Sequence, residues 1–171
     1  EAGLFGPNST DPLLGYEAYF DVDASIDHHL MQAFTKNPDG LRLSTFLVKD
    51  RDGKLAFGPI WDFDRASGAD NDARAADPTG WFLPDVNLFE SDWWGPLFDD
   101  PDFSQRWIDR WQELRGSVLS DANIQATVTG QANELAESQV RNFAQWPDSA
   151  PNGGPYAEPG LTGWSAEISQ L

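Results

Sequence analysis

Three aspartates in two short segments are the residues of this sequence best suited to chemistry. Asp39 lies in "KNPDG", and Asp62 and Asp64 alternate with aromatic residues in "GPIWDFDRASG". Carboxylates on alternate residues of an extended segment are hard oxygen ligands of the kind that Mg²⁺ and Ca²⁺ take. A further carboxylate near such a metal can act as base for a hydroxyl nucleophile. The spacing alone also fits an ordinary role for all three as turn and helix caps.

A helix and a β-hairpin are expected to position these aspartates. The helical spacing of Ile26, Leu30, Ala33 and Phe34 predicts a helix over 24–36. Its N-cap would be Asp23 or Ser25, and Lys36 would lie in its last turn. Two β-prone runs, 43–48 and 55–60, flank "KDRDGK" and predict a hairpin.

The order of these elements predicts that the aspartates converge. Asp39 precedes the first predicted strand and Asp62 follows the second. Both should therefore lie at one end of the hairpin, with carboxylates within about 10 Å of each other, close enough to share a phosphate and its metal ion. The second strand reads as buried, so Trp61 and Phe63 are expected to anchor its end in the core while Asp62 points outward.

The rest of the chain reads as mainly helical. Residues 65–100 show no sustained period and should contain short helical turns. A helix beginning at Pro101 should bury one face. That face consists of Phe103, Trp107, Trp111 and Leu114. A second helix is expected over 120–146, ended by Pro147, followed by a loop and by the start of another helix in "WSAEISQL". The sequence thus predicts a single α+β domain over 1–171, cut from a longer polypeptide.

Charge narrows the range of partners. Lysine and arginine number 11 against 28 aspartates and glutamates, so the net charge is −17. Such a chain repels nucleic acid and anionic lipid. An anionic substrate such as a nucleotide would need a local cation, most simply a divalent metal. There is no cysteine for disulfides or thiolate sites, and no apolar run long enough for a membrane span.

The segment "DASIDHHLMQAFTKNPDGLRLSTFLVKDRDGKLAFGPIWDFDRASG" resembles the CotH family of atypical protein kinases. Its most specific part is "KN.DG.RLSTF..KD..GKL..GP.WDFD", and the similarity extends from about Gly15 to the end of the chain. The resemblance implies the C-terminal lobe of a kinase-like fold. It implies transfer of the γ-phosphoryl of ATP, with Mg²⁺ or Mn²⁺, to Ser or Thr hydroxyls of extracellular or coat proteins. A secreted or cell-surface protein of a bacterium is expected.

The resemblance also assigns site residues. Asp39 matches the catalytic-loop aspartate, and Asp62 matches the metal-binding aspartate that corresponds to the DFG aspartate of ordinary kinases. Asp64 matches the second acid of the motif and is a further candidate ligand. Ser44 stands near the place where many members carry a metal-holding asparagine, and would be a weaker ligand. The Gly-rich loop and the lysine–glutamate pair of a kinase are expected from an N-terminal part of the polypeptide.

A different function class also remains open. A kinase-like lobe could serve as the scaffold of a non-catalytic extracellular adhesion or glycan-binding module. Exposed Trp81, Trp93 and Trp94 would then form a sugar platform. The loop "GADNDARAAD" could hold Ca²⁺, whereas "DRDGK" lacks the spacing of a calcium loop and reads as a hairpin turn. His28 and His29 are adjacent on the predicted helix and are expected to be structural rather than metal ligands.

Overall fold

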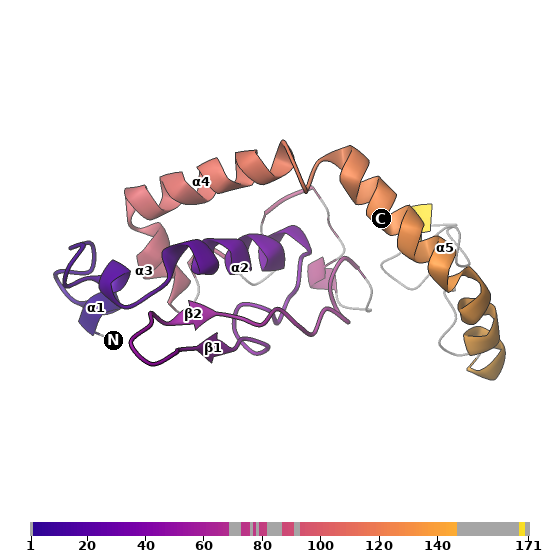
Figure 1. Ribbon diagram of the computed structural model, residues 1–171, viewed down its shortest axis with the longest axis horizontal. Helices are drawn as coiled ribbons and strands as arrows, with labels where there is room; N and C mark the ends of the chain where they lie inside the picture. The colour runs from indigo at the N-terminus through magenta and orange to yellow at the C-terminus, as the bar shows by residue number, and fades with distance from the viewer. Residues whose placement is uncertain are drawn as a thin grey trace. The chain divides into compact units, whose positions relative to one another are not determined.

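The computed structural model describes residues 2–68, 73–75, 77, 79–81, 87–90, 93–146 and 168–169. Its helices are α1 (Ala2–Phe5), η1 (Tyr16–Ala18), α2 (Val22–Phe34), η2 (Ala73–Ala75), α3 (Trp94–Phe98), α4 (Pro101–Arg115) and α5 (Asp121–Gln145), and its strands are β1 (Leu47–Val48) and β2 (Ala56–Phe57) (Figure 1). The strands form one antiparallel sheet. The predicted α+β class is therefore confirmed.

The chain separates into two compact units, residues 1–111 and 112–171. The single-domain prediction remains a prediction. In the second unit, α5 begins after Ser120 and ends at Gln145, so its bounds agree with the predicted helix over 120–146. None of its described side chains is buried, and Leu135 and Trp146 are exposed. The predicted loop over 147–163 lies outside the described residues. Of "WSAEISQL" only 168–169 are described, and they are helical.

Helix α2 is the centre of the first unit, and Figure 1 shows it between α4 and the hairpin. It begins two residues earlier than predicted because its N-cap is Asp21, whose side chain accepts a hydrogen bond from the Ala24 N–H at 3.1 Å. The predicted caps, Asp23 and Ser25, lie inside the helix. Three of the four predicted apolar residues are buried, and Phe34 is half-buried.

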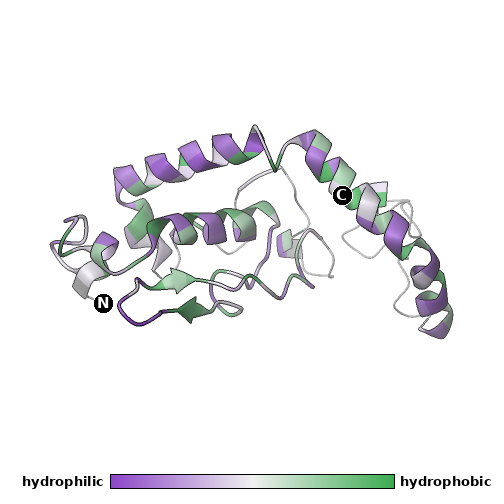
Figure 2. Ribbon diagram, viewed as in Figure 1, coloured by the Kyte–Doolittle hydropathy of each residue, from purple (hydrophilic) through white to green (hydrophobic). Residues whose placement is uncertain are grey.

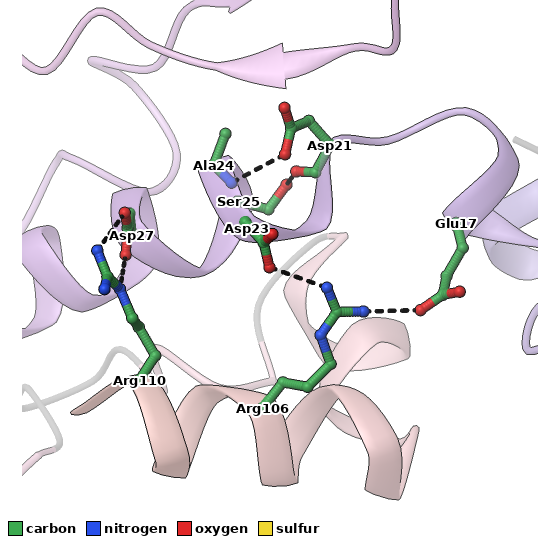
Figure 3. A network of polar contacts seen from close by, with 8 residues as sticks. All are labelled: Glu17, Asp21, Asp23, Ala24, Ser25, Asp27, Arg106 and Arg110. Atoms are coloured by element: carbon green, nitrogen blue, oxygen red, sulfur yellow. Dashed lines mark hydrogen bonds and ion pairs between the residues drawn. The ribbon is translucent and has the colours of Figure 1, made fainter. Parts of the chain in front are cut away.

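Ion pairs connect α4 to α2 and η1 on the solvent side of this packing (Figure 3). Arg106 contacts Glu17 and Asp23, each at 2.9 Å. Arg110 donates two hydrogen bonds to Asp27, at 2.7 and 3.0 Å. Because these side chains are 35–87% exposed, the pairs contribute little to the stability of the fold.

Aromatic residues fill the core. Trp94 and Phe103 are fully buried and Trp107 is 7% exposed, whereas Trp111 and Leu114 are half-buried, so the predicted α4 face is buried in its first half. Trp94 stacks on Phe57 with ring centroids 4.7 Å apart.

The prediction that Trp94 is exposed as part of a tryptophan platform is wrong. Trp94 lies in the core, and Trp93 is half-buried. Trp81 packs edge-on against Trp107 and Trp111, at centroid distances of 5.4 and 4.9 Å. Aromatic contacts of this kind stabilise a core through buried area and ring geometry.

Both histidines of α2 are structural, as predicted. His28 and His29 are buried to 2% and 0% exposure. Trp107 Nε1 donates to His29 Nδ1 at 3.1 Å, and His29 Nε2 lies 2.9 Å from the Leu88 carbonyl oxygen. This arrangement assigns the proton to Nε2 of a neutral ring. Burial lowers the pKa of His29 to about 4.

The hairpin is shorter than predicted. Leu47 pairs with Phe57 and Val48 with Ala56, and the Gly58 N–H still bonds the Phe46 carbonyl at 3.0 Å. Pro59 follows and has no N–H to continue the pairing. Figure 2 shows hydrophobic strands joined by a hydrophilic loop. The end of the second predicted strand is exposed rather than buried: Ile60 is 45% exposed, and Trp61, the next residue, is 46% exposed. No helix within the described ranges is both long and apolar enough to cross a membrane.

Candidate active site

The loop that carries Asp39 begins with an unusual helix end. The Lys36 N–H bonds the Ala33 carbonyl at 3.2 Å and the Asn37 N–H bonds the Gln32 carbonyl at 3.0 Å, which is a Schellman motif. Lys36 has a φ of 55°, where glycine is usual and other residues cost about 1 kcal/mol. The prediction that Lys36 lies in the last helical turn is wrong. It lies beyond the cap and is 6% exposed, and burial lowers the pKa of its amine.

A closed turn follows and brings Ser44 back beside Asp39. The Asp39 carbonyl accepts the N–H groups of Arg42, Leu43 and Ser44 at 3.2, 2.9 and 3.0 Å. At the start of this turn, a Cβ on Gly40 would lie 2.0 Å from Oε1 of the fully buried Gln32. The glycine of "NPDG" is therefore required by close packing on α2.

Asp62 is held by polar partners from this loop. The buried Ser44 hydroxyl donates to Asp62 Oδ2 at 2.8 Å, and Asn37 Nδ2 donates to the Asp62 carbonyl at 3.0 Å. Asp62 has a φ of 66°, a left-handed conformation that aspartate tolerates better than most residues. Trp61 is not a core anchor. Its Nε1 donates to the Ser44 carbonyl at 3.1 Å, and its ring packs on Phe46.

The structure thus brings three of the four predicted site residues together. The Ser44 N–H bonds the main-chain carbonyl of Asp39, and the Ser44 hydroxyl bonds the side chain of Asp62. Because that hydroxyl is buried and already donates to Asp62, Ser44 orients the carboxylate. Its predicted role as a weak ligand stays a prediction. Asp64 is exposed and has no hydrogen bond or ion pair with another described residue.

Asp62 and Asp64 are candidates for holding a metal ion that is also coordinated by the phosphates of a substrate. Within the described part of the chain, no group of three or more histidine, cysteine or acidic residues is placed to hold a metal ion by itself. Mg²⁺ needs only one or two carboxylates when substrate phosphates and water complete its shell. Asp62 and Asp64 could supply these. Residues 69–72 and 76 of the loop "GADNDARAAD" lie outside the described residues, so its Ca²⁺ site stays a prediction.

Two arginines complete the site, and the sequence did not indicate them. Arg65 Nη1 lies 2.8 Å from Asp39 Oδ2, and Arg74 Nη2 lies 3.9 Å from Asp39 Oδ1. The Asp39 side chain is 16% exposed. Arg65 directly follows "WDFD", which could have drawn attention to it. Arg74 lies in η2, within a stretch whose sequence gives no such signal.

The fold and the site define a class before any comparison. The chain is an α+β protein in which the buried Ser44 bonds the main-chain carbonyl of Asp39 and the carboxylate of Asp62. The model of the family described as CotH kinase protein matches residues 6–171, and the chain belongs to this family. The predicted resemblance is confirmed. Membership implies kinase-type chemistry, with ATP and a divalent metal in general and a protein substrate. No curated protein and no solved structure matches the chain.

Proposed function

We propose that this chain forms the C-terminal, kinase-like lobe of an atypical protein kinase that phosphorylates Ser or Thr hydroxyls of proteins. The observation that carries the proposal is that Ser44 joins the main-chain carbonyl of Asp39 to the carboxylate of Asp62, which brings the two loops side by side. A kinase needs one aspartate for the metal of the nucleotide and another near the attacking hydroxyl. The two residues that match these roles are 23 positions apart and share one buried partner.

Each residue then has a defined role in the transfer. Asp62, with Asp64, would hold Mg²⁺ or Mn²⁺, which when bound neutralises charge on the phosphates. The acceptor hydroxyl oxygen forms a bond to the γ-phosphorus while the bond from that phosphorus to the β–γ bridging oxygen breaks. ADP leaves, and Asp39 takes the hydroxyl proton. Ser44 keeps the Asp62 carboxylate in one orientation, which lowers the cost of positioning it.

The remaining parts of the proposal concern the polypeptide around this site. The Gly-rich loop and the lysine–glutamate pair of the kinase would come from an N-terminal part of the polypeptide. The kinase would act on proteins at the surface of a bacterial cell or outside it. The alternative, a glycan-binding module, is weakened because Trp94 is fully buried and Trp81 packs on α4.

Two substitutions separate metal binding from proton transfer. Asp62→Ala should abolish Mg²⁺-dependent ATP binding, because the metal loses its main anionic ligand. Asp39→Ala should spare ATP binding and remove phosphoryl transfer, because the base acts on the acceptor hydroxyl. Asp50→Ala, at an exposed aspartate of the hairpin loop, is the matched control and should change neither.

Calorimetric titration with Mg-ATP and radiolabel transfer from ATP measure the two effects, in the longest natural polypeptide that contains this chain. The 171-residue chain alone should show negligible transfer. If Asp62→Ala and Asp39→Ala bind and transfer like the parent, the kinase proposal is wrong and the aspartates are turn and helix caps.

A further inference from the structure

We propose that Arg65 and Arg74 form a phosphate-binding pair that holds Asp39 when no phosphate is present and binds the transferred phosphoryl group during the reaction. The phosphate site is inferred from the geometry of the chain, and its part in transfer rests on the proposed function. The ligand class is a phosphate or phosphoryl anion.

The two guanidinium groups lie on the two oxygens of one carboxylate. Arg65 contacts Asp39 Oδ2 at 2.8 Å and Arg74 contacts Oδ1 at 3.9 Å. The side chains of Arg65 and Arg74 are 35% and 24% exposed, against 16% for Asp39. Because both arginine side chains are more exposed than Asp39, a small anion from solvent reaches the guanidinium groups more readily than it reaches the carboxylate. Any hydroxyl that bonds to Asp39 must lie beside these arginines, and so must the phosphorus that it attacks.

Charge gives the second argument. Asp39, Asp62 and Asp64 place three negative charges close together in a chain whose net charge, these three included, is −17. A divalent metal offsets two of them, and the phosphates of a nucleotide then add several more. Two guanidinium groups beside Asp39 supply the cations that an anionic substrate needs in this acidic protein. Their planar forks also match phosphate oxygens in a way that an ammonium group does not.

The transfer step favours movement of the arginines from carboxylate to phosphate. When the hydroxyl proton passes to Asp39, the carboxylate becomes neutral and its attraction for the guanidinium groups falls. The new oxygen–phosphorus bond forms as the bond to ADP breaks, and the oxygens of the transferred group carry the charge. The arginines therefore bind the transition state better than the starting complex, which is the condition for a catalytic contribution.

Binding of inorganic phosphate to the 171-residue chain tests the site without requiring activity. Arg65→Ala and Arg74→Ala should each weaken phosphate binding by about 10-fold or more, because each removes a charged hydrogen-bond donor. Asp39→Asn should strengthen phosphate binding several-fold, because a carboxylate that competes with phosphate for the arginines is gone while the arginines remain. Arg51→Ala, at an exposed arginine of the hairpin loop, removes the same charge elsewhere and should have no effect.

NMR titration measures these affinities and also shows whether each variant is folded. If the arginines only form a structural ion pair with Asp39, Asp39→Asn should leave the affinity for phosphate unchanged or lower it. The direction of the change in affinity therefore decides between a structural pair and a phosphate site. The site is refuted if the parent does not bind phosphate, if both alanine variants at the arginines bind like the parent, or if Asp39→Asn leaves binding unchanged or weakens it.

Transfer kinetics in the longest natural polypeptide test the catalytic part. Arg65→Ala should lower kcat by about 100-fold to 1,000-fold with a smaller change in the KM for Mg-ATP, and Arg65→Lys should restore only part of the loss. An active parent whose kcat is unchanged in Arg65→Ala and Arg74→Ala overturns this inference and leaves the proposed kinase intact. A parent that binds phosphate through the arginines but transfers no phosphoryl group overturns the proposed function and leaves the phosphate site.

Discussion

His29 should stay neutral down to about pH 4 and should make the folded state less stable as the pH falls below about 6.5. The ring is fully buried, and burial lowers its pKa to about 4. Its Nδ1 accepts from the Trp107 indole and its Nε2 donates to the Leu88 carbonyl. A second ring proton would turn Nδ1 into a donor that faces another donor, so protonation would break the bond to Trp107.

The magnitude follows from the two pKa values. The imidazole of the unfolded chain has a pKa of about 6.5, so the unfolded state binds more protons than the folded state between that value and about 4. The free energy of unfolding therefore falls as the pH is lowered through this window, by about 3 kcal/mol in total. The effect is absent above pH 6.5 and complete below pH 4. It is a large part of a typical stability of about 5–15 kcal/mol.

A titration of the ¹⁵N-labelled imidazoles gives the pKa directly. His29→Gln supplies the matched variant, because an amide can accept from Trp107 and donate to Leu88 but does not titrate. All carboxylates titrate in both proteins, so the difference between their unfolding free energies isolates His29. Between pH 7.5 and pH 4, the parent should lose about 3 kcal/mol of unfolding free energy relative to His29→Gln. A ring that titrates near 6.5, or a difference that is independent of pH, would show that the reasoning is wrong.

Three further substitutions probe stability by urea denaturation. Tyr16→Phe should lower the free energy of unfolding by about 1.5–3 kcal/mol, because it leaves Oδ2 of the buried Asp100 without its 2.7 Å donor, and an unchanged value would contradict this. Lys36→Gly should raise stability by up to about 1 kcal/mol through relief of the positive φ, and a loss would mean that the lysine side chain matters more than the strain. Arg110→Ala should lower the free energy of unfolding by less than about 1 kcal/mol, and by less still at high salt, because the ion pair with Asp27 is exposed. A decrease of more than about 2 kcal/mol would refute this.

Local sequence determined the elements and the family. The sequence predicted the bounds of α2 and α5 to within two residues at each end. Apolar residues that lie on one face of a helix recur every 3.6 residues on average, and this spacing can be recognised in the sequence. The motif around "KNPDG" and "WDFD" was sufficient to indicate the CotH kinase family. The hairpin was also indicated, although its strands were predicted too long because Pro59 and the turn after Asp39 interrupt the pairing.

Only the tertiary structure decided which side chains meet. The partners of His29 lie 59 and 78 residues away in sequence, and no local pattern marks them. Trp94 is in the core because α3 packs it against Phe57, although its neighbours in sequence read as an exposed loop. The two arginines on Asp39 likewise come from separate segments, the turn after "WDFD" and η2. Local propensities depend on near neighbours, whereas ion pairs and buried hydrogen bonds depend on how distant segments pack, so these contacts are set by the folded chain as a whole.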